Sequence, residues 1–100
     1  MPYRVRIIVE EVRGYCALGY RPGDSFVIEK YYIPGGGHPP ICIHALNAML
    51  TLLMPFIKGV SAKTLGIGDQ ENIGYVQCPD PGKPYTSGGT VVFKLVREKI

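Results

Sequence analysis

The sequence predicts an α+β domain in which two β-hairpins form a curved antiparallel sheet or partial barrel around one central apolar helix, in the order β-β-α-β-β. Three observations support this prediction: apolar residues alternate near both ends of the chain, one long apolar segment lies in the middle, and turns rich in proline and glycine separate them. A chain of 100 residues is long enough to bury one core and too short for two, so residues 1–100 form a single predicted domain.

The first hairpin is predicted from two strand-like segments. Apolar residues recur at every second position in residues 3–9, which is the period of a half-buried strand, and the phase changes at Glu10, which predicts a bulge or a strand end there. Pro22 and Gly23 suit the two central positions of a type II turn, because proline presets the first φ and glycine accepts a positive φ at the second. Residues 25–32 are rich in β-branched and aromatic side chains and form the predicted second strand.

The helix is predicted to begin at or just after Pro40, behind the breaker segment 34–40. Pro55 is expected to kink it or to end it about one turn early, and Lys58-Gly59 supplies a stop. One narrow sector is polar and holds His44, Asn47, Thr51 and Lys58, while apolar residues fill the remaining circumference. A single small sheet covers only one side of such a helix. The sequence therefore predicts either a strongly curved sheet wrapped around it or a homodimer interface on the remaining face.

The second hairpin is predicted from residues 73–78 and 90–96, with a long loop between them and Val91, Phe93 and Leu95 pointing inward. Residues 61–72 are polar and are expected to form a loop or a short extra turn. Basic and acidic residues are interleaved near both ends of the chain, Arg97 among them. This pattern predicts strands with a solvated face of mixed charge.

Composition and charge exclude several classes of protein. Hydrophobic residues make up 46% and charged residues 19%, which is ordinary for a globular domain and argues against disorder. The net charge of +3 is not gathered into a basic arm, and the seven tyrosines form no recognisable motif with the arginines, so nucleic acid is not indicated as a partner. The apolar segment 41–57 is short for a bilayer and is interrupted by Pro55, which favours a buried helix over a membrane span.

Three cysteines stand in turns or at element boundaries, where metal binding and redox chemistry tend to occur: Cys16, Cys42 and Cys78. An odd number of cysteines cannot be fully paired into disulfides, and the chain does not begin with a pattern like that of a signal peptide. We therefore expect a cytoplasmic protein whose thiols are free or bound to metal.

Several short motifs that contain cysteine, glycine or proline follow one another along the chain. Cys16-Ala-Leu-Gly19 is followed by Gly23-Asp24-Ser-Phe26, and Cys42-Ile-His44-Ala-Leu46 is followed by Cys78-Pro-Asp-Pro81. With these motifs, in this order over nearly the whole chain, the sequence resembles a family of short uncharacterised bacterial and archaeal proteins. The resemblance implies one compact domain and draws attention to the three thiols. It implies no substrate and no mechanism.

The first functional hypothesis is a metal site formed by Cys16, Cys42 and Cys78, with a fourth position held by His44, an aspartate, water or a ligand. Three soft thiolates suit zinc or an iron–sulfur cluster. Two features weigh against it: no pair has the Cys-x-x-Cys spacing that nucleates most such sites, and Cys42 and His44 point about 200° apart in a regular helix. These two residues share a metal only if the helix begins after Cys42.

The second hypothesis is thiol catalysis or redox chemistry at Cys42 alone, because the first turn of a helix stabilises a thiolate. His38 or His44 would act as a base, oriented by Asp24 or Asp80. Each residue also has a plainer interpretation. Cys42 is equally a small core side chain, His44 a hydrogen-bonding partner beneath a loop, and both aspartates the caps of Pro/Gly turns.

The third hypothesis belongs to another class: a non-enzymatic interaction or scaffold module that dimerises through its apolar helix and has structural cysteines. The sequence names no substrate, small-molecule ligand or reaction, so it does not decide whether the protein is an enzyme. Metal content and thiol reactivity would separate the three hypotheses.

Overall fold

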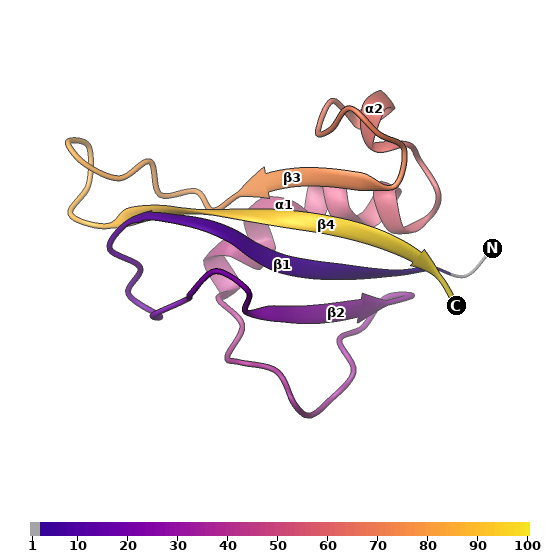
Figure 1. The fold of residues 1–100 in the computed structure, drawn as a ribbon, viewed down its shortest axis with the longest axis horizontal. Coiled ribbons are helices and arrows are strands. Elements are labelled where there is room, and N and C mark those ends of the chain that lie inside the picture. The colour runs from indigo at the N-terminus through magenta and orange to yellow at the C-terminus, as the bar shows by residue number, and fades with distance from the viewer. Residues whose placement is uncertain (1–2) are drawn as a thin grey trace.

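The computed structural model describes residues 3–100, in the order β1 (Tyr3–Gly14), β2 (Ser25–Glu29), α1 (Ile43–Ile57), α2 (Ala62–Leu65), β3 (Ile73–Gln77) and β4 (Gly89–Lys99). The four strands form one antiparallel sheet in the order β2-β1-β4-β3, and α1 lies across one face of it (Figure 1). The predicted α+β class and both predicted hairpins are confirmed. The edge strands β2 and β3 do not meet, so the sheet is open and does not close into a barrel.

The long strands β1 and β4 form the centre of the sheet and pair along their whole length, from Tyr3 opposite Lys99 to Gly14 opposite Gly89. Their register shifts between Val9 and Glu11, so the predicted bulge at Glu10 is confirmed. The extra residue returns Val12 to the apolar face, where it lies opposite Val91. Because of this shift, apolar side chains stay on one face of the twelve-residue strand both before and after the two consecutive glutamates.

The turn before β2 forms at Pro22-Gly23 as predicted. The Asp24 N–H donates to the carbonyl oxygen of Arg21 at 3.0 Å, and Gly23 has a φ of 97°, which glycine adopts without the strain that a side chain would add. Backbone hydrogen bonds to Val9 then attach this turn to β1. The turn therefore fixes where β2 begins beside β1.

Helix α1 begins at Ile43, three residues later than the earliest predicted start, and Cys42 is its N-cap with extended φ and ψ of −72° and 117°. Of the two effects predicted for Pro55, the early end of the helix is wrong, since α1 continues through Pro55 to Ile57, and the kink stays a prediction. The proline falls in the last turn, where only the hydrogen bond to Thr51 is lost. Gly59, with a φ of 110°, then leads the chain away from the helix as predicted.

The core lies between α1 and the covered face of the sheet. The helix contributes one stripe at spacings of three and four residues, and the strands contribute alternate positions. The fully or nearly fully buried side chains of these elements are Val5, Ile7, Val9, Phe26, Ile28, Ala45, Met49, Leu53, Phe56, Ile57, Val91, Phe93 and Leu95. None of the helices described in residues 3–100 is long and apolar enough to cross a membrane.

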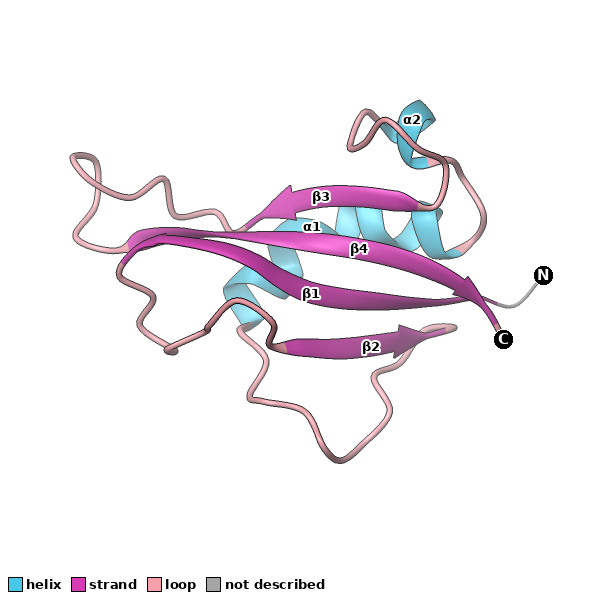
Figure 2. Ribbon diagram, in the orientation of Figure 1, coloured by secondary structure: helices cyan, strands magenta, loops and turns pink. Residues whose placement is uncertain are grey.

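The sheet packs against one side of α1 and does not close around the helix (Figure 2). The predicted polar stripe faces outward, and His44, Asn47 and Thr51 are exposed. Ile43 also lies on the outside and is 75% exposed. The other predicted alternative, a homodimer interface on the outer face, stays a prediction.

Arg97 contradicts the expectation of a solvated charged strand, because it is only 8% exposed and points toward the helix side of the sheet. Its Nη1 donates to the carbonyl oxygens of Phe56 and Val60, each at 2.7 Å. Its Nη2 and Nε donate to Asn72 Oδ1, and Nη2 also donates to the carbonyl oxygen of Glu71. The guanidinium therefore caps the C-terminal end of α1, where the helix dipole favours a cation.

Candidate functional site

A cavity of about 140 Å³ opens where the β1–β2 loop, the start of α1 and the end of β3 meet β4. In Figure 1 this is the end of the sheet at which the indigo β1–β2 loop passes the first turn of α1. Its wall is mostly apolar. It includes Tyr15, Cys16, Ala17, Leu18, Tyr20, Cys42, His44, Ala45, Cys78, Pro79, Asp80, Gly89, Val91 and Phe93. The structure thus brings all four predicted metal-site residues to one cavity, although they come from three separate parts of the chain.

Cys42 is the N-cap residue of α1 and precedes the first helical turn. Its extended backbone precedes the first helical residue, Ile43, and its side chain makes no capping hydrogen bond. The geometric objection that Cys42 and His44 point to opposite sides of one helix therefore does not apply. The half-buried thiol of Cys42 lies near the positive end of the dipole of α1, which stabilises negative charge on sulfur.

Tyr20 is a site residue that sequence reasoning missed. It follows Cys16 by four residues, is 7% exposed and packs its ring edge-on against Phe93, with 5.9 Å between the ring centroids. Its hydroxyl accepts a hydrogen bond from the Cys42 N–H and donates one to the carbonyl oxygen of Pro40, both at 3.0 Å. The only sequence signal was an aromatic residue just before the Pro22-Gly23 turn, which does not reveal a partner twenty residues away.

Cys78 is the most buried of the three thiols, at 9% exposure. Its Sγ accepts the N–H of Val91 at 3.3 Å, and its own N–H donates to the carbonyl oxygen of Val91 at 3.0 Å. The sulfur also lies 3.9 Å from the carbonyl oxygens of Asp80 and Gly89. As a thiol it can donate to one of these oxygens, and as a thiolate it retains the amide of Val91.

Cys16 occupies a more open position than Cys78. It is half-buried in the β1–β2 loop, where its carbonyl oxygen accepts the N–H of Gly19 at 2.9 Å. Its neighbours Tyr15, Ala17 and Leu18 are exposed. The thiol therefore lies on a short turn of exposed residues, partly buried against the edge of the core.

The two histidines occupy different environments. His44 is exposed and lines the rim of the cavity, whereas His38 lies outside the lining, with Nδ1 2.9 Å from the carbonyl oxygen of Pro39. Asn47 and Thr51 do not line the cavity, so the polar stripe of the helix meets the site only through His44. Of the two proposed bases for Cys42, only His44 borders the same cavity.

Both aspartates cap turns, as their plainer interpretation predicted. Asp24 Oδ2 accepts the Arg21 N–H at 2.9 Å. Asp80 Oδ1 accepts hydrogen bonds from the Thr86 hydroxyl and from the Gly82 N–H, and together these hold the pKa of Asp80 below its ordinary value.

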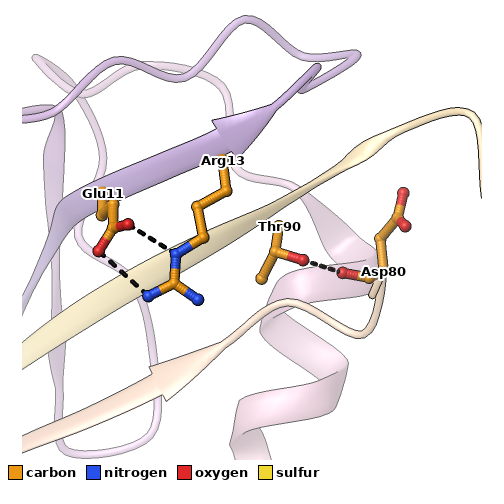
Figure 3. Close-up of polar contacts among 4 residues, drawn as sticks. All are labelled: Glu11, Arg13, Asp80 and Thr90. Carbon is orange, nitrogen blue, oxygen red and sulfur yellow. Dashed lines mark hydrogen bonds and ion pairs between the residues drawn. The ribbon is translucent and has the colours of Figure 1, made fainter. Parts of the chain in front are cut away.

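The backbone of Asp80 is also held in place. Its carbonyl oxygen accepts the Thr90 hydroxyl at 2.5 Å, beside the exposed ion pair between Glu11 and Arg13 (Figure 3). The backbone of the loop that follows Cys78 is therefore attached to β4 through the Thr90 hydroxyl, while the Asp80 side chain makes hydrogen bonds within the loop itself.

Most of the ionisable groups that line the cavity can carry negative charge. Among the described residues, the lining includes three thiols, one carboxylate and one imidazole, and neither a lysine nor an arginine. Within residues 3–100, no three His, Cys, Asp or Glu side chains are gathered closely enough, as they stand, to hold a metal ion. The three cysteines are free thiols. Ionised thiols in this cavity would make it a negatively charged site with little compensating positive charge.

The chain was compared with known proteins by sequence and by structure. No family model, curated protein or solved structure matches it. The function must therefore be argued from the cavity itself.

Proposed function

We propose that the protein binds a soft metal ion in the cavity through Cys16, Cys42 and Cys78, with His44 or water in the fourth position. The observation that carries the proposal is that three thiols far apart in the sequence line one small cavity. Thiolates bind zinc and other soft cations strongly, and three protein ligands with one open position are a common arrangement for zinc.

The size and charge of the cavity favour a single ion. At about 140 Å³ it is smaller than the roughly 300–1,000 Å³ of sites that hold drug-sized molecules. Thiolates without a neighbouring lysine or arginine repel an anionic substrate and attract a cation. A single soft ion such as zinc therefore suits the size and the charge of the cavity.

Binding requires the thiols to move closer together. The Cys42 N–H donates to the Tyr20 hydroxyl, and the Cys78 sulfur accepts the Val91 N–H. Cys16, in contrast, lies on a loop of exposed residues. We infer that the turn at Cys16 closes over the ion. Metal sites commonly complete themselves on binding, because the ligands lose their protons and gain a shared cation at that moment.

The test is a metal titration of protein purified and kept under reducing, oxygen-free conditions. Cobalt added as a probe should give thiolate-to-metal charge-transfer absorption, and zinc should displace it at one ion per chain. Replacing Cys16, Cys42 or Cys78 by serine should each lower the affinity by more than the ~10–100-fold that loss of an outer-shell partner costs. An unchanged affinity in any of the three variants would exclude that cysteine from the site.

The two histidines supply a matched pair of variants. His44→Ala should weaken zinc binding, because His44 borders the cavity, and His38→Ala should leave it unchanged, because His38 lies outside the lining. Equal effects of the two substitutions would show that the fourth position is not His44.

A second candidate is thiol redox chemistry, which the unequal burial of the cysteines favours: Cys16 and Cys42 are half-buried and Cys78 is buried. It predicts that Cys42 alkylates faster than free cysteine near neutral pH. If the protein binds no metal and all three thiols react slowly, the cysteines belong to the core and the protein is better described as an interaction module. Its predicted homodimer would then be sought by sedimentation, with Ile43→Ser on the exposed face of α1 as the disrupting variant.

A further inference from the structure

We propose that Tyr20 is the positioning residue of the thiol cavity, which fixes Cys42 at the mouth of the cavity and thereby sets the affinity for the metal ion. This inference rests on the proposed function. Tyr20 does not need to touch the ion, because it acts through the backbone of the segment that carries Cys42.

The Tyr20 hydroxyl makes two hydrogen bonds to the segment that carries Cys42. It has one hydrogen to donate, which goes to the carbonyl oxygen of Pro40, and it accepts the N–H of Cys42. These two bonds lie on either side of Ile41 and hold the extended backbone that precedes the helix. Without them, the segment would rely on Pro39-Pro40 alone to keep the Cys42 side chain at the cavity.

Packing of the Tyr20 ring fixes the position of its hydroxyl. The ring packs against Phe93 of β4, and it belongs to the loop that carries Cys16. Phe93 stands two residues after Val91, whose amide holds the sulfur of Cys78. Tyr20 therefore connects the Cys16 loop, the Cys42 segment and the strand that orients Cys78.

The surroundings of the phenol support this placement. Burial raises the pKa of Tyr20, the hydrogen bond from the Cys42 N–H partly opposes that change, and negative charge on Cys42 and Cys16 raises the pKa further. The phenol therefore stays protonated at neutral pH and keeps the hydrogen that it donates to Pro40.

The test is Tyr20→Phe, which removes the hydroxyl and keeps the ring. Zinc affinity should fall by about 10-fold or more, as expected for loss of a partner that orients a ligand. In the metal-free protein, Cys42 should alkylate several times faster because its segment is released, while the rate at Cys78 should not change. Mass spectrometry of the modified peptides measures each thiol separately.

Two control variants separate positioning from a general loss of stability. Tyr75→Phe removes a hydroxyl from an exposed side chain on the opposite face of the sheet and should change neither measurement. Ile28→Val weakens the core away from the cavity, so any change in rate that it causes should affect Cys78 and Cys42 alike. A rise confined to Cys42 occurs only if the hydroxyl positions that residue.

The outcomes for Tyr20 and for the metal site can be told apart. If wild-type protein binds no zinc, the proposed metal function fails, and the alkylation of Cys42 in Tyr20→Phe still decides the positioning role. If wild-type protein binds zinc but Tyr20→Phe keeps both the affinity and the Cys42 rate within twofold of wild type, Tyr20 does not position the site and the inference is overturned.

Discussion

Arg97 shows how one buried charge can be stabilised without a carboxylate. Its five N–H groups are directed at carbonyl oxygens and at one amide oxygen, which together complete the end of α1 and the turn before β3. The guanidinium also lies over the rings of Phe56 and Tyr3, at 4.6 and 5.0 Å from their centroids. Most of its desolvation cost is therefore offset by hydrogen bonds, the helix dipole and the two rings.

Replacing Arg97 should destabilise the fold strongly. Arg97→Met is expected to lower the free energy of unfolding by about 3 kcal/mol, because several buried acceptors lose their donors at once. Arg97→Lys should recover only part of this loss, since one ammonium group cannot reach both the helix end and Asn72. Urea denaturation measures both variants.

Arg6 is the matched control for Arg97, because it lies on the uncovered face and makes one ion pair with Glu98 at 3.7 Å. Arg6→Met should change the unfolding free energy by only about 0–1 kcal/mol. Equal losses in Arg6→Met and Arg97→Met would show that the buried hydrogen-bond network contributes nothing special.

Asp80 should titrate below its ordinary pKa of 3.8, because the Thr86 hydroxyl and the Gly82 N–H both donate to the ionised carboxylate. A depressed folded-state pKa means that this carboxylate stabilises the fold fully above pH 3.8, and that the contribution is lost as the pH falls through the lower folded value. Thr86→Ala removes the larger cause and should raise the pKa of Asp80 toward 3.8. Carboxyl NMR titration measures the change, with Thr64→Ala on α2 as the control. A pKa for Asp80 at or above 3.8 in the wild type would contradict the assigned hydrogen bonds.

Single residues explain where the sequence prediction of the site succeeded and failed. The cysteines were recognisable because thiols in turns are uncommon, whereas Tyr20 was missed because its partner, Cys42, is twenty-two residues away. Arg97 was misassigned although it is in phase with Phe93 and Leu95 on β4, which places it on the covered face. Its charge outweighed its position in the interpretation, and the period-2 pattern was the better guide.

At the scale of elements, it was harder to predict where each helix or strand begins and ends than to predict that it forms. All four strands and α1 were expected, but β1 and β4 extend several residues beyond their predicted ends because they pair with each other, which local patterns do not reveal. The start of α1 matters most for the site. It moved from Pro40 to Ile43, and this difference of one turn places Cys42 at the cavity and not within the helix.

The junction of β1 with β4 depends on Gly89. A Cβ at this position would lie 2.1 Å from the carbonyl oxygen of Arg13 and 2.6 Å from the backbone nitrogen of Tyr15, and neither atom can move without disturbing β1. Gly89→Ala should therefore lower the unfolding free energy by at least about 2 kcal/mol. At Gly35, nothing lies within 4 Å of an added Cβ, so Gly35→Ala should be close to neutral in the same denaturation experiment. A neutral Gly89→Ala would mean that the two strands do not approach so closely.

At the scale of the whole molecule, strand order decides where the cavity forms. Placing β1 and β4 side by side brings the loop after β1, the loop after β3 and the start of α1 to the same end of the sheet (Figure 1). Two hairpins and a helix could be predicted from local patterns. The central β1–β4 pairing joins the two ends of the chain, and it is this long-range contact that brings Cys16 and Cys78 to one cavity.

This arrangement predicts how metal binding should spread through the molecule. Without metal, amide hydrogen exchange should be slowest in the paired centre of β1 and β4 and fast in the loops that carry Cys16 and Cys78. Zinc should then slow exchange in three segments at once, around Cys16, Cys42 and Cys78, because one ion would hold all three. The loop before β3, around Glu71 and Asn72, lies at the opposite end of the sheet and should not change (Figure 1). Protection confined to a single cysteine segment would show that the ion binds locally, and the shared site would have to be abandoned.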